Sequence, residues 1–300
     1  MRFAAIDLGT NTFDILIVDF ANDSWDICFQ EKQWVRLGLD FYPQKMLTER
    51  AIKDAVDCLH RFKKLCLKYG VTKPRIIGTS ALRDASNRAI LIEKVKYLLQ
   101  WEIEVVSGEE EALIVCKGTT SLSTCPNDGL IMDIGGGSTE LIRFSAHQIK
   151  YAVSLNVGVS RLLAEIGTDH VLNRIEISRI FSHFDQCLSV KIDKPVNLIG
   201  SSGPFETFYQ LVNKQRLPER ACLPLPTDRL EALLNDLILS TSEERMVLKH
   251  VPEFRKKYLH LAALQLKWVL FRFNIKQVYS SSLALNDGII ELQKQSEMLD

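Results

Sequence analysis

The sequence predicts an α/β fold built from two similar lobes with a cleft between them. Two stretches carry this prediction, residues 3–20 and residues 129–144. Each runs from an apolar strand through Asp-x-Gly and a small polar turn into a second apolar strand. Both are followed by alternating helical and strand patterns, which are typical of α/β lobes. An internal repeat of this kind suggests that the two strand–turn–strand segments face each other across the cleft.

The first lobe is expected to hold three antiparallel strands followed by alternating helices and strands. Residues 24–35 alternate loosely as the third strand. Apolar residues at helical spacing then run from a cap at Thr48 to Gly70 and predict a long helix. The next predicted elements are a strand at 74–79, a polar loop at 80–87, a helix at 88–100 and a strand at 102–106.

The last helix of this lobe begins with three consecutive acids. Ser107 and Glu110 have the Ser-x-x-Glu spacing of a capping box, which gives Glu110 a structural role. Glu109 and Glu111 fit either a complement to the positive helix end or a catalytic role. A polar connection at residues 119–128 separates the lobes, and we predict domains at 1–124 and 125–300.

The second lobe repeats the plan. Its predicted strands cover residues 130–134, 141–144, 149–155, 195–200 and 277–281, and its helices cover 158–166, 205–212, most of 227–273 and 285–295, with a loop at 213–226. Ser202 and Gly203 form a small-residue turn before a helix, which is a possible phosphate contact or an ordinary turn.

Composition narrows the functional classes. The chain has 300 residues, of which 46% are hydrophobic, and 37 basic residues balance 37 acidic ones. No global field therefore attracts nucleic acid or a membrane surface. Seven scattered cysteines without a CxxC pair argue against a disulfide framework and a zinc site. With no signal peptide or long apolar span, we expect a soluble cytoplasmic protein, and the long apolar helical region near the C-terminus makes a homodimer plausible.

The two turns have the composition of phosphate-binding loops. Glycines let a ligand approach the main chain, and a run of inward N–H groups suits phosphate oxygens. The candidate ligands are Gly9, Thr10, Asn11 and Thr12 in the first turn and Gly135, Gly136, Gly137, Ser138 and Thr139 in the second. Asp133 and Glu140 flank the second turn, and carboxylates beside phosphate call for a cation such as Mg²⁺. The alternative is a glycine-rich hairpin with two solvated acids.

Seven motifs resemble those of one family, in the same order along the chain: DLGTNTF, GTSALRDASN, SGEEEA, DIGGGSTEL, LNVGVSRL, IGSSG and SSLALNDGII. The chain is thereby similar to the Ppx/GppA exopolyphosphatases and guanosine pentaphosphate phosphohydrolases, over almost its whole length. The resemblance implies two ribonuclease-H-like domains of the actin-like ATPase type, without the long C-terminal domains of larger members. It also implies Mg²⁺-dependent removal of a terminal phosphate, with polyphosphate as the substrate and guanosine pentaphosphate as the alternative.

The resemblance also implies roles for individual residues. Glu111 looks like the catalytic glutamate that activates water, and it is an acid that the capping box leaves available. Arg83 lies in a loop that the family uses at its site, and its guanidinium would donate two hydrogen bonds to a phosphate. The guanidinium of Arg161 could do the same. Asp133 and Glu140 resemble the family's metal-side acids, with Asp7 facing them.

Two positions depart from the family pattern. Asp14 stands where a basic residue is usual, and Pro204 follows the Ser-x-Gly turn where a small residue is usual. Both departures are also compatible with a different function, that of a non-catalytic sensor that binds polyphosphate or a nucleotide. An actin-like ATPase or kinase is a third reading, which would require an adenosine pocket in the second lobe.

Overall fold

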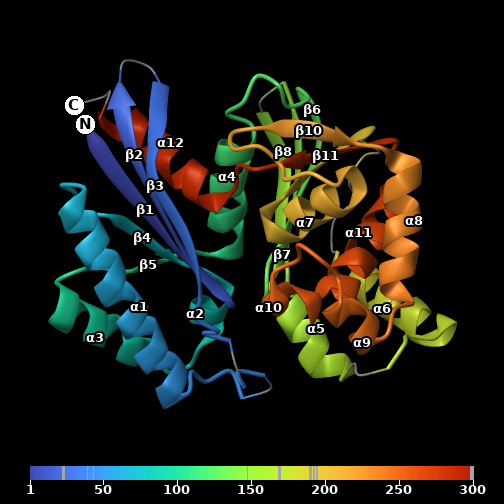
Figure 1. The fold of residues 1–300 in the computed structure, drawn as a ribbon, viewed down its shortest axis with the longest axis horizontal. Coiled ribbons are helices and arrows are strands. Elements are labelled where there is room, and N and C mark those ends of the chain that lie inside the picture. Colours follow the sequence, from blue (N-terminus) through green and yellow to red (C-terminus); the bar gives the residue numbers. More distant parts are fainter. Residues whose placement is uncertain are drawn as a thin grey trace. The chain divides into compact units, whose positions relative to one another are not determined.

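The computed structural model describes residues 1–21, 24–38, 40–42, 44–146, 148–167, 170–188, 191, 193 and 195–297. The chain divides into two compact units (Figure 1). Unit 1 comprises Met1–Gly118 and Leu285–Asp300, and unit 2 comprises Thr119–Ala284. The predicted α/β fold of two lobes is confirmed. The domain bounds differ from the predicted 1–124 and 125–300, because the C-terminal helix returns to unit 1.

Unit 1 contains a five-stranded sheet in the order β3-β2-β1-β4-β5. The strands are β1 (Arg2–Leu8), β2 (Thr12–Ala21), β3 (Ser24–Trp34), β4 (Arg75–Gly78) and β5 (Glu104–Val105). The first three pair antiparallel, and β4 and β5 add in parallel. The helices of this unit are α1 (Glu49–Lys68), α2 (Ser80–Asp84), α3 (Arg88–Leu99), α4 (Gly108–Thr119) and α12 (Leu285–Glu297).

Two helix groups pack on the unit 1 sheet. Alternate β1 side chains such as Ile6 join a core with α1, α2 and α3, while α12 packs on β1 and β2. Gly288 lets α12 cross α4 closely, because an added Cβ would lie 1.9 Å from the Ile114 carbonyl oxygen. Trp25 Nε1 donates to Glu291 Oε1 at 2.8 Å. These contacts explain why α12 belongs to unit 1 although it is last in the sequence.

Unit 2 contains a six-stranded sheet in the order β10-β11-β9-β6-β7-β8. The strands are β6 (Asp128–Ile134), β7 (Thr139–Ser145), β8 (Gln148–Leu155), β9 (Asn197–Ser201), β10 (Cys222–Leu225) and β11 (Gln277–Ser281). The helices are α5 (Val159–Ile166), α6 (Arg174–Cys187), α7 (Ser202–Asn213), α8 (Thr227–Ile238), α9 (Ser242–Met246), α10 (Glu253–Lys256) and α11 (Leu259–Phe273). As in unit 1, three antiparallel strands lead the sheet and a parallel strand joins the first of them.

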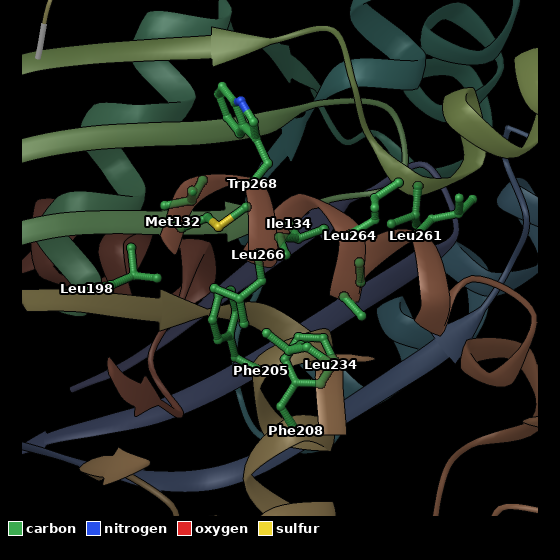
Figure 2. Close-up of a cluster of buried hydrophobic side chains, with 14 of the residues drawn as sticks. Met132, Ile134, Leu198, Phe205, Phe208, Leu234, Leu261, Leu264, Leu266 and Trp268 are labelled. Carbon is green, nitrogen blue, oxygen red and sulfur yellow. The ribbon is translucent and has the colours of Figure 1, made fainter. Parts of the chain in front are cut away.

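A large apolar core holds the unit 2 helices to the sheet. Figure 2 shows Met132 and Ile134 of β6 among side chains from α7, α8 and α11, including Phe205, Leu234 and Trp268. Burial of this apolar surface provides the main favourable free energy of folding. The last β6 residue in this core, Ile134, directly precedes the glycine turn, so the core fixes the point from which the turn starts.

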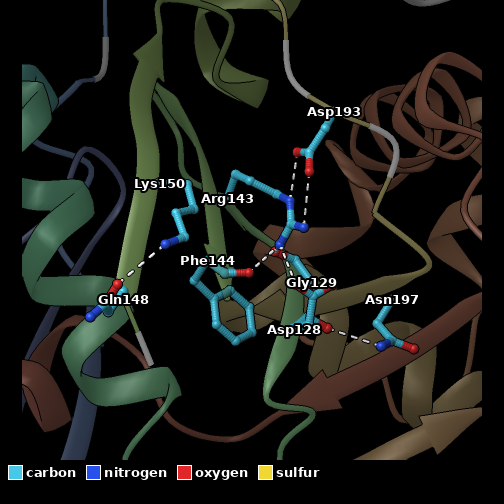
Figure 3. Close-up of polar contacts among 8 residues, drawn as sticks. All are labelled: Asp128, Gly129, Arg143, Phe144, Gln148, Lys150, Asp193 and Asn197. Atoms are coloured by element: carbon cyan, nitrogen blue, oxygen red, sulfur yellow. Dashed lines mark hydrogen bonds and ion pairs between the residues drawn. The ribbon is translucent and has the colours of Figure 1, made fainter. Parts of the chain in front are cut away.

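Arg143 ties the other end of the hairpin together (Figure 3). Its guanidinium donates to Asp193 Oδ1 at 2.7 Å, to Asp128 Oδ1 at 2.9 Å and to the Gly129 carbonyl at 3.2 Å. The hydrogen bonds from Arg143 lower the pKa of the Asp193 carboxyl. This cluster supports β6 and β7 at the end farthest from the turn.

Two local expectations differ from the structure. The predicted loop at 80–87 contains the short helix α2, and the predicted loop at 213–226 contains β10. Pro224 lies in β10, which is tolerated because β10 is the edge strand of its sheet.

All seven cysteines are free thiols. Across the part of the chain that is described, no helix has the length and apolar character needed to span a membrane.

Candidate active site

The second glycine turn connects β6 to β7, and its carbonyl groups accept hydrogen bonds from the start of α5. Gly135 N donates to the Ser138 carbonyl at 3.0 Å, which closes the turn. The carbonyls of Gly135, Gly136 and Gly137 accept bonds from the backbone at the start of α5: Val159 N at 3.0 Å, Ser160 N at 2.8 Å and Gly158 N at 3.3 Å, respectively. In a trans peptide the N–H points opposite to the C=O. The N–H groups of residues 136–138 therefore point away from α5, as a phosphate cradle requires.

Gly158 makes this arrangement possible. A Cβ at Gly158 would lie 2.4 Å from the carbonyl carbons of both Gly136 and Gly137. Such a contact is far inside van der Waals distance, so only glycine allows α5 to approach the turn. The positive end of the α5 dipole thereby lies directly behind the turn, which favours anions near it.

Arg161 and Thr139 support the turn in ways that the sequence did not reveal. Arg161 Nε donates to the Gly137 carbonyl at 2.9 Å, and its side chain is buried. The Thr139 hydroxyl donates at 2.6 Å to Oε1 of Gln265, a buried residue of α11. The structure thus gives both side chains a positioning role, in place of the direct phosphate contact expected for the Thr139 hydroxyl.

Asp133 and Glu140 lie directly opposite each other on β6 and β7. Residues opposite each other in an antiparallel pair point to the same face of the sheet, so the two carboxylates share a face. Ser154, opposite Glu140 on β8, donates its hydroxyl to Glu140 Oε1 at 2.7 Å. Two neighbouring carboxylates beside a phosphate turn are a donor set that Mg²⁺ prefers, since this ion usually takes one or two carboxylates and completes its shell with water and phosphate. Within the described ranges, no three or more His, Cys, Asp or Glu side chains form a metal-binding cluster.

The first turn, in unit 1, has the same internal geometry. Gly9 N donates to the Thr12 carbonyl at 3.0 Å. The Thr10 carbonyl accepts from Gly38 N at 2.8 Å, and the Asn11 carbonyl accepts from the backbone of residues 35 and 36. By the same trans-peptide argument, the N–H groups of Asn11 and Thr12 point away from this supporting loop.

An acid pair also flanks the first turn. Asp7 on β1 lies opposite Asp14 on β2, and Asp14 lies opposite Lys32 on β3. Lys32 Nζ is 3.4 Å from Asp14 Oδ2. Asp14, which stands where the family usually has a basic residue, therefore has an ammonium partner on the neighbouring strand.

Glu111 and Glu110 separate into different roles at the start of α4. The predicted capping box is present: Ser107 N donates to Glu110 Oε2 at 2.7 Å, and Glu110 N donates to Ser107 Oγ at 3.1 Å. The backbone hydrogen bond from Ser107 lowers the pKa of Glu110. Glu111 is instead almost buried and accepts from Arg83 Nη1 at 2.7 Å.

Arg83 reaches Glu111 from α2, the short helix after β4. Its Nη1 also donates to the Val106 carbonyl at 3.2 Å. The two predicted catalytic residues of unit 1 are therefore in direct contact. A charge-assisted hydrogen bond of this length fixes the orientation of the Glu111 carboxylate.

Other residues of the chain contact the Ser202–Gly203 turn at the positions where a phosphate was expected. Ser202 Oγ donates to the Ile134 carbonyl at 3.2 Å. Arg255 packs on Gly203 so closely that an added Cβ would lie 2.1 Å from its Nη2, and Arg255 Nη1 donates to Thr207 Oγ1 at 2.8 Å. This packing leaves Gly203 covered by an arginine. Pro204 lies in the first turn of α7, where its missing N–H breaks no helical bond.

Sequence reasoning missed the residues that support the site. Gly158 and Gln265 hold the second turn, while Ser154 and Lys32 hold the acids from the third strand of each sheet. The glycine of LNVGVSRL was a usable signal for Gly158. The third-strand partners follow only from the register of strand pairing, which the sequence did not specify.

The chain is similar to known proteins over most of its length. A family model described as "Ppx/GppA phosphatase family" matches residues 16–297. A guanosine-5'-triphosphate,3'-diphosphate pyrophosphatase of Vibrio parahaemolyticus is 31% identical over 222 residues, covering 72% of this chain and 45% of the relative. A protein of the same name from Aeromonas salmonicida is 27% identical over 96% of this chain and 58% of its own length. The chain thus spans about half the length of these curated relatives.

Solved structures match over a greater share of their length. An exopolyphosphatase from Cytophaga hutchinsonii has a TM-score of 0.91 and 27% identity, with 99% of this chain and 98% of that chain covered. A Ppx/GppA family member from Aquifex aeolicus has a TM-score of 0.83, 22% identity and coverage of 99% and 98%, and supports the fold alone.

Proposed function

We propose, because this chain belongs to the Ppx/GppA phosphatase family, that it is a phosphoanhydride hydrolase that removes the terminal phosphate from an anionic phosphate chain. The observation that carries the proposal is the contact between Arg83 and Glu111 at 2.7 Å. It holds a carboxylate in one orientation at the start of α4 while the neighbouring Glu110 completes the helix cap.

Glu111 acts as the base in this proposal. A water oxygen attacks the terminal phosphorus, Glu111 accepts a proton from that water, and the bridging P–O bond breaks. The bonding electrons stay with the bridging oxygen, which becomes a terminal oxygen of the shortened chain. Arg83 orients the Glu111 carboxylate and offers its remaining N–H groups to phosphate oxygens.

The two glycine turns bind phosphate oxygens through the main chain. Residues 136–138 and residues 11–12 have N–H groups directed away from their supporting backbone, and donors fixed before the reaction stabilise developing charge without reorganisation. Arg161 holds the second turn from behind through the Gly137 carbonyl. Ser202 and Gly203 remain a weaker candidate contact, because Arg255 covers Gly203.

Mg²⁺ is the cofactor that the donor chemistry fits. Asp133 and Glu140 share one face of the unit 2 sheet, and we assign them as carboxylates that hold the ion. When bound, Mg²⁺ would neutralise charge on the transferring phosphate. Ser154 orients Glu140 for this role.

Polyphosphate is the substrate we propose first. Its support is the likeness to the Cytophaga hutchinsonii exopolyphosphatase, which matches this chain from end to end. Guanosine pentaphosphate is the second candidate, supported by the 31% identical guanosine-5'-triphosphate,3'-diphosphate pyrophosphatase. Both substrates end in a phosphoanhydride, so the same hydrolytic groups serve either one. We place the activity in the cytoplasm.

A substrate panel tests this function. Phosphate release is measured from polyphosphate, guanosine pentaphosphate and ATP, with Mg²⁺ and with excess chelator, and Glu111→Gln protein purified in the same way controls for contaminating phosphatases. We expect Mg²⁺-dependent release from polyphosphate or guanosine pentaphosphate that exceeds release from ATP. Absence of release from the first two substrates contradicts the proposal, as does undiminished release in chelator.

A further inference from the structure

Ser80 is a buried serine to which the site described above gives no role. It is the first residue of α2, and it is 2% exposed. Its hydroxyl has no hydrogen-bond partner among the residues that the structure describes. A buried hydroxyl that makes no hydrogen bond costs free energy, so a group of this kind points to a partner that binds there.

The Ser80 hydroxyl does not cap the helix. The N-cap residue of α2 is Thr79, whose side chain makes no capping hydrogen bond. The Thr79 hydroxyl donates instead to the Leu8 carbonyl at 3.4 Å, and the Thr79 carbonyl accepts from Arg83 N at 2.8 Å. The start of α2 is therefore held by Thr79 rather than by the side chain of Ser80.

The strand order places Ser80 between the first glycine turn and Glu111. Strands β1, β4 and β5 run parallel, with β4 in the middle. β1 ends at the first turn, β4 leads into Ser80, and β5 leads into α4, which carries Glu111. The segments after β4 and β5 are joined by a hydrogen bond from Val106 N to the Gly78 carbonyl at 3.2 Å. Ligands of α/β proteins bind outside the carboxyl ends of parallel strands, and Ser80 lies at such an end.

Arg83 connects the same helix to the proposed base. Residues three apart on a helix lie on the same side of it, so Ser80 and Arg83 share one side of α2. Arg83 Nη1 donates to Glu111 Oε2 at 2.7 Å and to the Val106 carbonyl at 3.2 Å. The Ser80 hydroxyl and the Glu111 carboxylate therefore border the same region of unit 1.

We infer that the Ser80 hydroxyl is a further catalytic group, which binds the water that Glu111 activates. This inference rests on the proposed hydrolysis. The water donates one O–H to Glu111 and the other to Ser80 Oγ, which leaves a lone pair of the water oxygen to attack phosphorus. Glu111 takes the first proton, the second proton stays on the attacking oxygen, and Ser80 keeps its own. Two acceptors that orient the water before the reaction lower the barrier to attack.

The buried position of the hydroxyl is compatible with this role. A serine side chain turns about one bond between three staggered positions, so its hydroxyl can reach a bound water without a shift of the backbone. Catalytic hydrogen bonds often tighten only when the substrate is bound. A hydroxyl without a partner inside the protein therefore remains available to the water.

Ser80→Ala separates this role from a structural one. Because the hydroxyl has no partner in the protein, its removal should leave the melting temperature at or above the wild-type value. Loss of one of the two groups that orient the water should lower kcat about tenfold to 100-fold, with little change in KM. Phosphate release from polyphosphate and guanosine pentaphosphate measures kcat and KM, and thermal denaturation measures stability.

Thr119→Val is the matched control. Thr119 is the last residue of α4, it is fully buried, and its hydroxyl also has no hydrogen-bond partner within the described part of the chain. It lies at the opposite end of α4 from Glu111. This variant should keep the wild-type kcat and should melt at or above the wild-type temperature.

A second comparison uses Glu111→Gln as the background. Groups that act as a unit have non-additive effects on the rate. If Ser80 and Glu111 act on one water, Ser80→Ala should lower kcat much less in Glu111→Gln protein than in wild type.

The outcomes separate this inference from the proposed function. A wild-type protein that releases no phosphate from either substrate contradicts both. If the wild type is active, an unchanged kcat in Ser80→Ala contradicts the inference alone, as does a loss confined to KM, which would place the hydroxyl on the substrate. A marked fall in melting temperature together with the loss of activity would give Ser80 a structural role instead. Full additivity with Glu111→Gln would place the hydroxyl away from the attacking water.

Discussion

The two strand–turn–strand repeats have the same backbone arrangement. They differ in the element that donates hydrogen bonds to the carbonyl groups of each turn. Both turns close with a hydrogen bond from glycine to a carbonyl three residues later, at 3.0 Å in each case. Both carry acids directly opposite each other, Asp7 with Asp14 and Asp133 with Glu140. The loop after β3 holds the carbonyls of the first turn, whereas the N-terminus of α5 holds those of the second.

The difference in support has an electrostatic consequence. A helix N-terminus carries a partial positive charge that favours anions within about one turn of it, and a loop carries no comparable dipole. The second turn is thus the stronger candidate for holding the phosphate that is transferred. We therefore expect the two turns to contribute unequally to phosphate binding.

The third strand adds a second difference. Lys32 compensates the charge of Asp14 with an ammonium group, while Ser154 donates a hydroxyl to Glu140 and leaves the charge of that carboxylate in place. A cation is therefore expected to interact more strongly with the acids of the second repeat than with those of the first. Four predictions follow in order of decreasing effect; three test this comparison, and one concerns the stability of unit 2.

The largest effect is expected from adding a methyl group at Gly158. Gly158→Ala forces α5 away from the backbone of the second turn, and a displacement of about 1 Å in a catalytic site costs about 100-fold in rate. The matched change in the first repeat is Gly38→Ala, whose Cβ would meet Thr10 Cγ2 at 2.4 Å. Because a threonine side chain yields more readily than backbone, this variant should lose much less activity. Equal losses in kcat/KM would show that the supports are equivalent.

Removal of one carboxylate charge should distinguish the two acid pairs. Asp133→Asn should raise the Mg²⁺ concentration needed for half-maximal activity by about tenfold or more, a typical effect of disturbing a metal site. Asp14→Asn should change it little, since Lys32 already compensates Asp14. Titration of activity with Mg²⁺ measures both values. A larger shift for Asp14→Asn than for Asp133→Asn would reverse the assignment.

Acid should destabilise unit 2 through His260. Burial lowers the pKa of this α11 histidine to about 3, with Arg245 adding to the shift. In the unfolded chain histidine titrates near 6.5, so below that pH the unfolded state binds more protons than the folded state. The contribution of His260 to the free energy of unfolding should therefore be complete above about pH 6.5 and fall by up to about 1.4 kcal/mol for each pH unit between about pH 6.5 and pH 3.

Chemical denaturation at pH 7 and pH 5 measures this slope. His260→Gln lowers stability at both values but should remove the acid-dependent part. If the two proteins lose stability in parallel between pH 7 and pH 5, His260 is not the source of acid sensitivity.

The smallest effect concerns Lys32 and Asp14. Lys32→Ala should raise KM for long polyphosphate a few-fold at low salt, and Asp14→Arg should lower it, because these changes alter the local field that a polyanion meets. Both effects should disappear at high salt as the charges are screened. Unchanged KM values at low salt would place this pair away from the path of the substrate.

Much of the fold could be predicted because it depends on local patterns. The two Asp-x-Gly turns, the α4 capping box and the long helix α1 all follow from spacing along the chain. Contacts between distant segments could not be predicted in this way. The return of α12 to unit 1 depends on Gly288 against Ile114, and β10 pairs with the distant strand β11 in an edge position that tolerates Pro224.

The site shows the same division. The sequence predicted the glycine turns and the flanking acids as site residues, and the structure shows Arg83 in contact with Glu111. The sequence predicted Thr139 as a phosphate ligand because it directly follows the glycine turn. Strand alternation instead turns Thr139 into the core while Glu140 faces the other way.

The most direct test of the hydrolytic account compares two neighbouring glutamates. Glu110→Gln can still close the capping box with Ser107, and a cap contributes about 0.5–2 kcal/mol, so this variant should keep its turnover and most of its stability. Glu111→Gln keeps its size and its bond from Arg83 but cannot take a proton from water. It should bind polyphosphate normally, melt near the wild-type temperature and lose about 10²–10⁴-fold in kcat. A loss of turnover in Glu110→Gln alone, or in neither variant, would contradict Glu111 as the base.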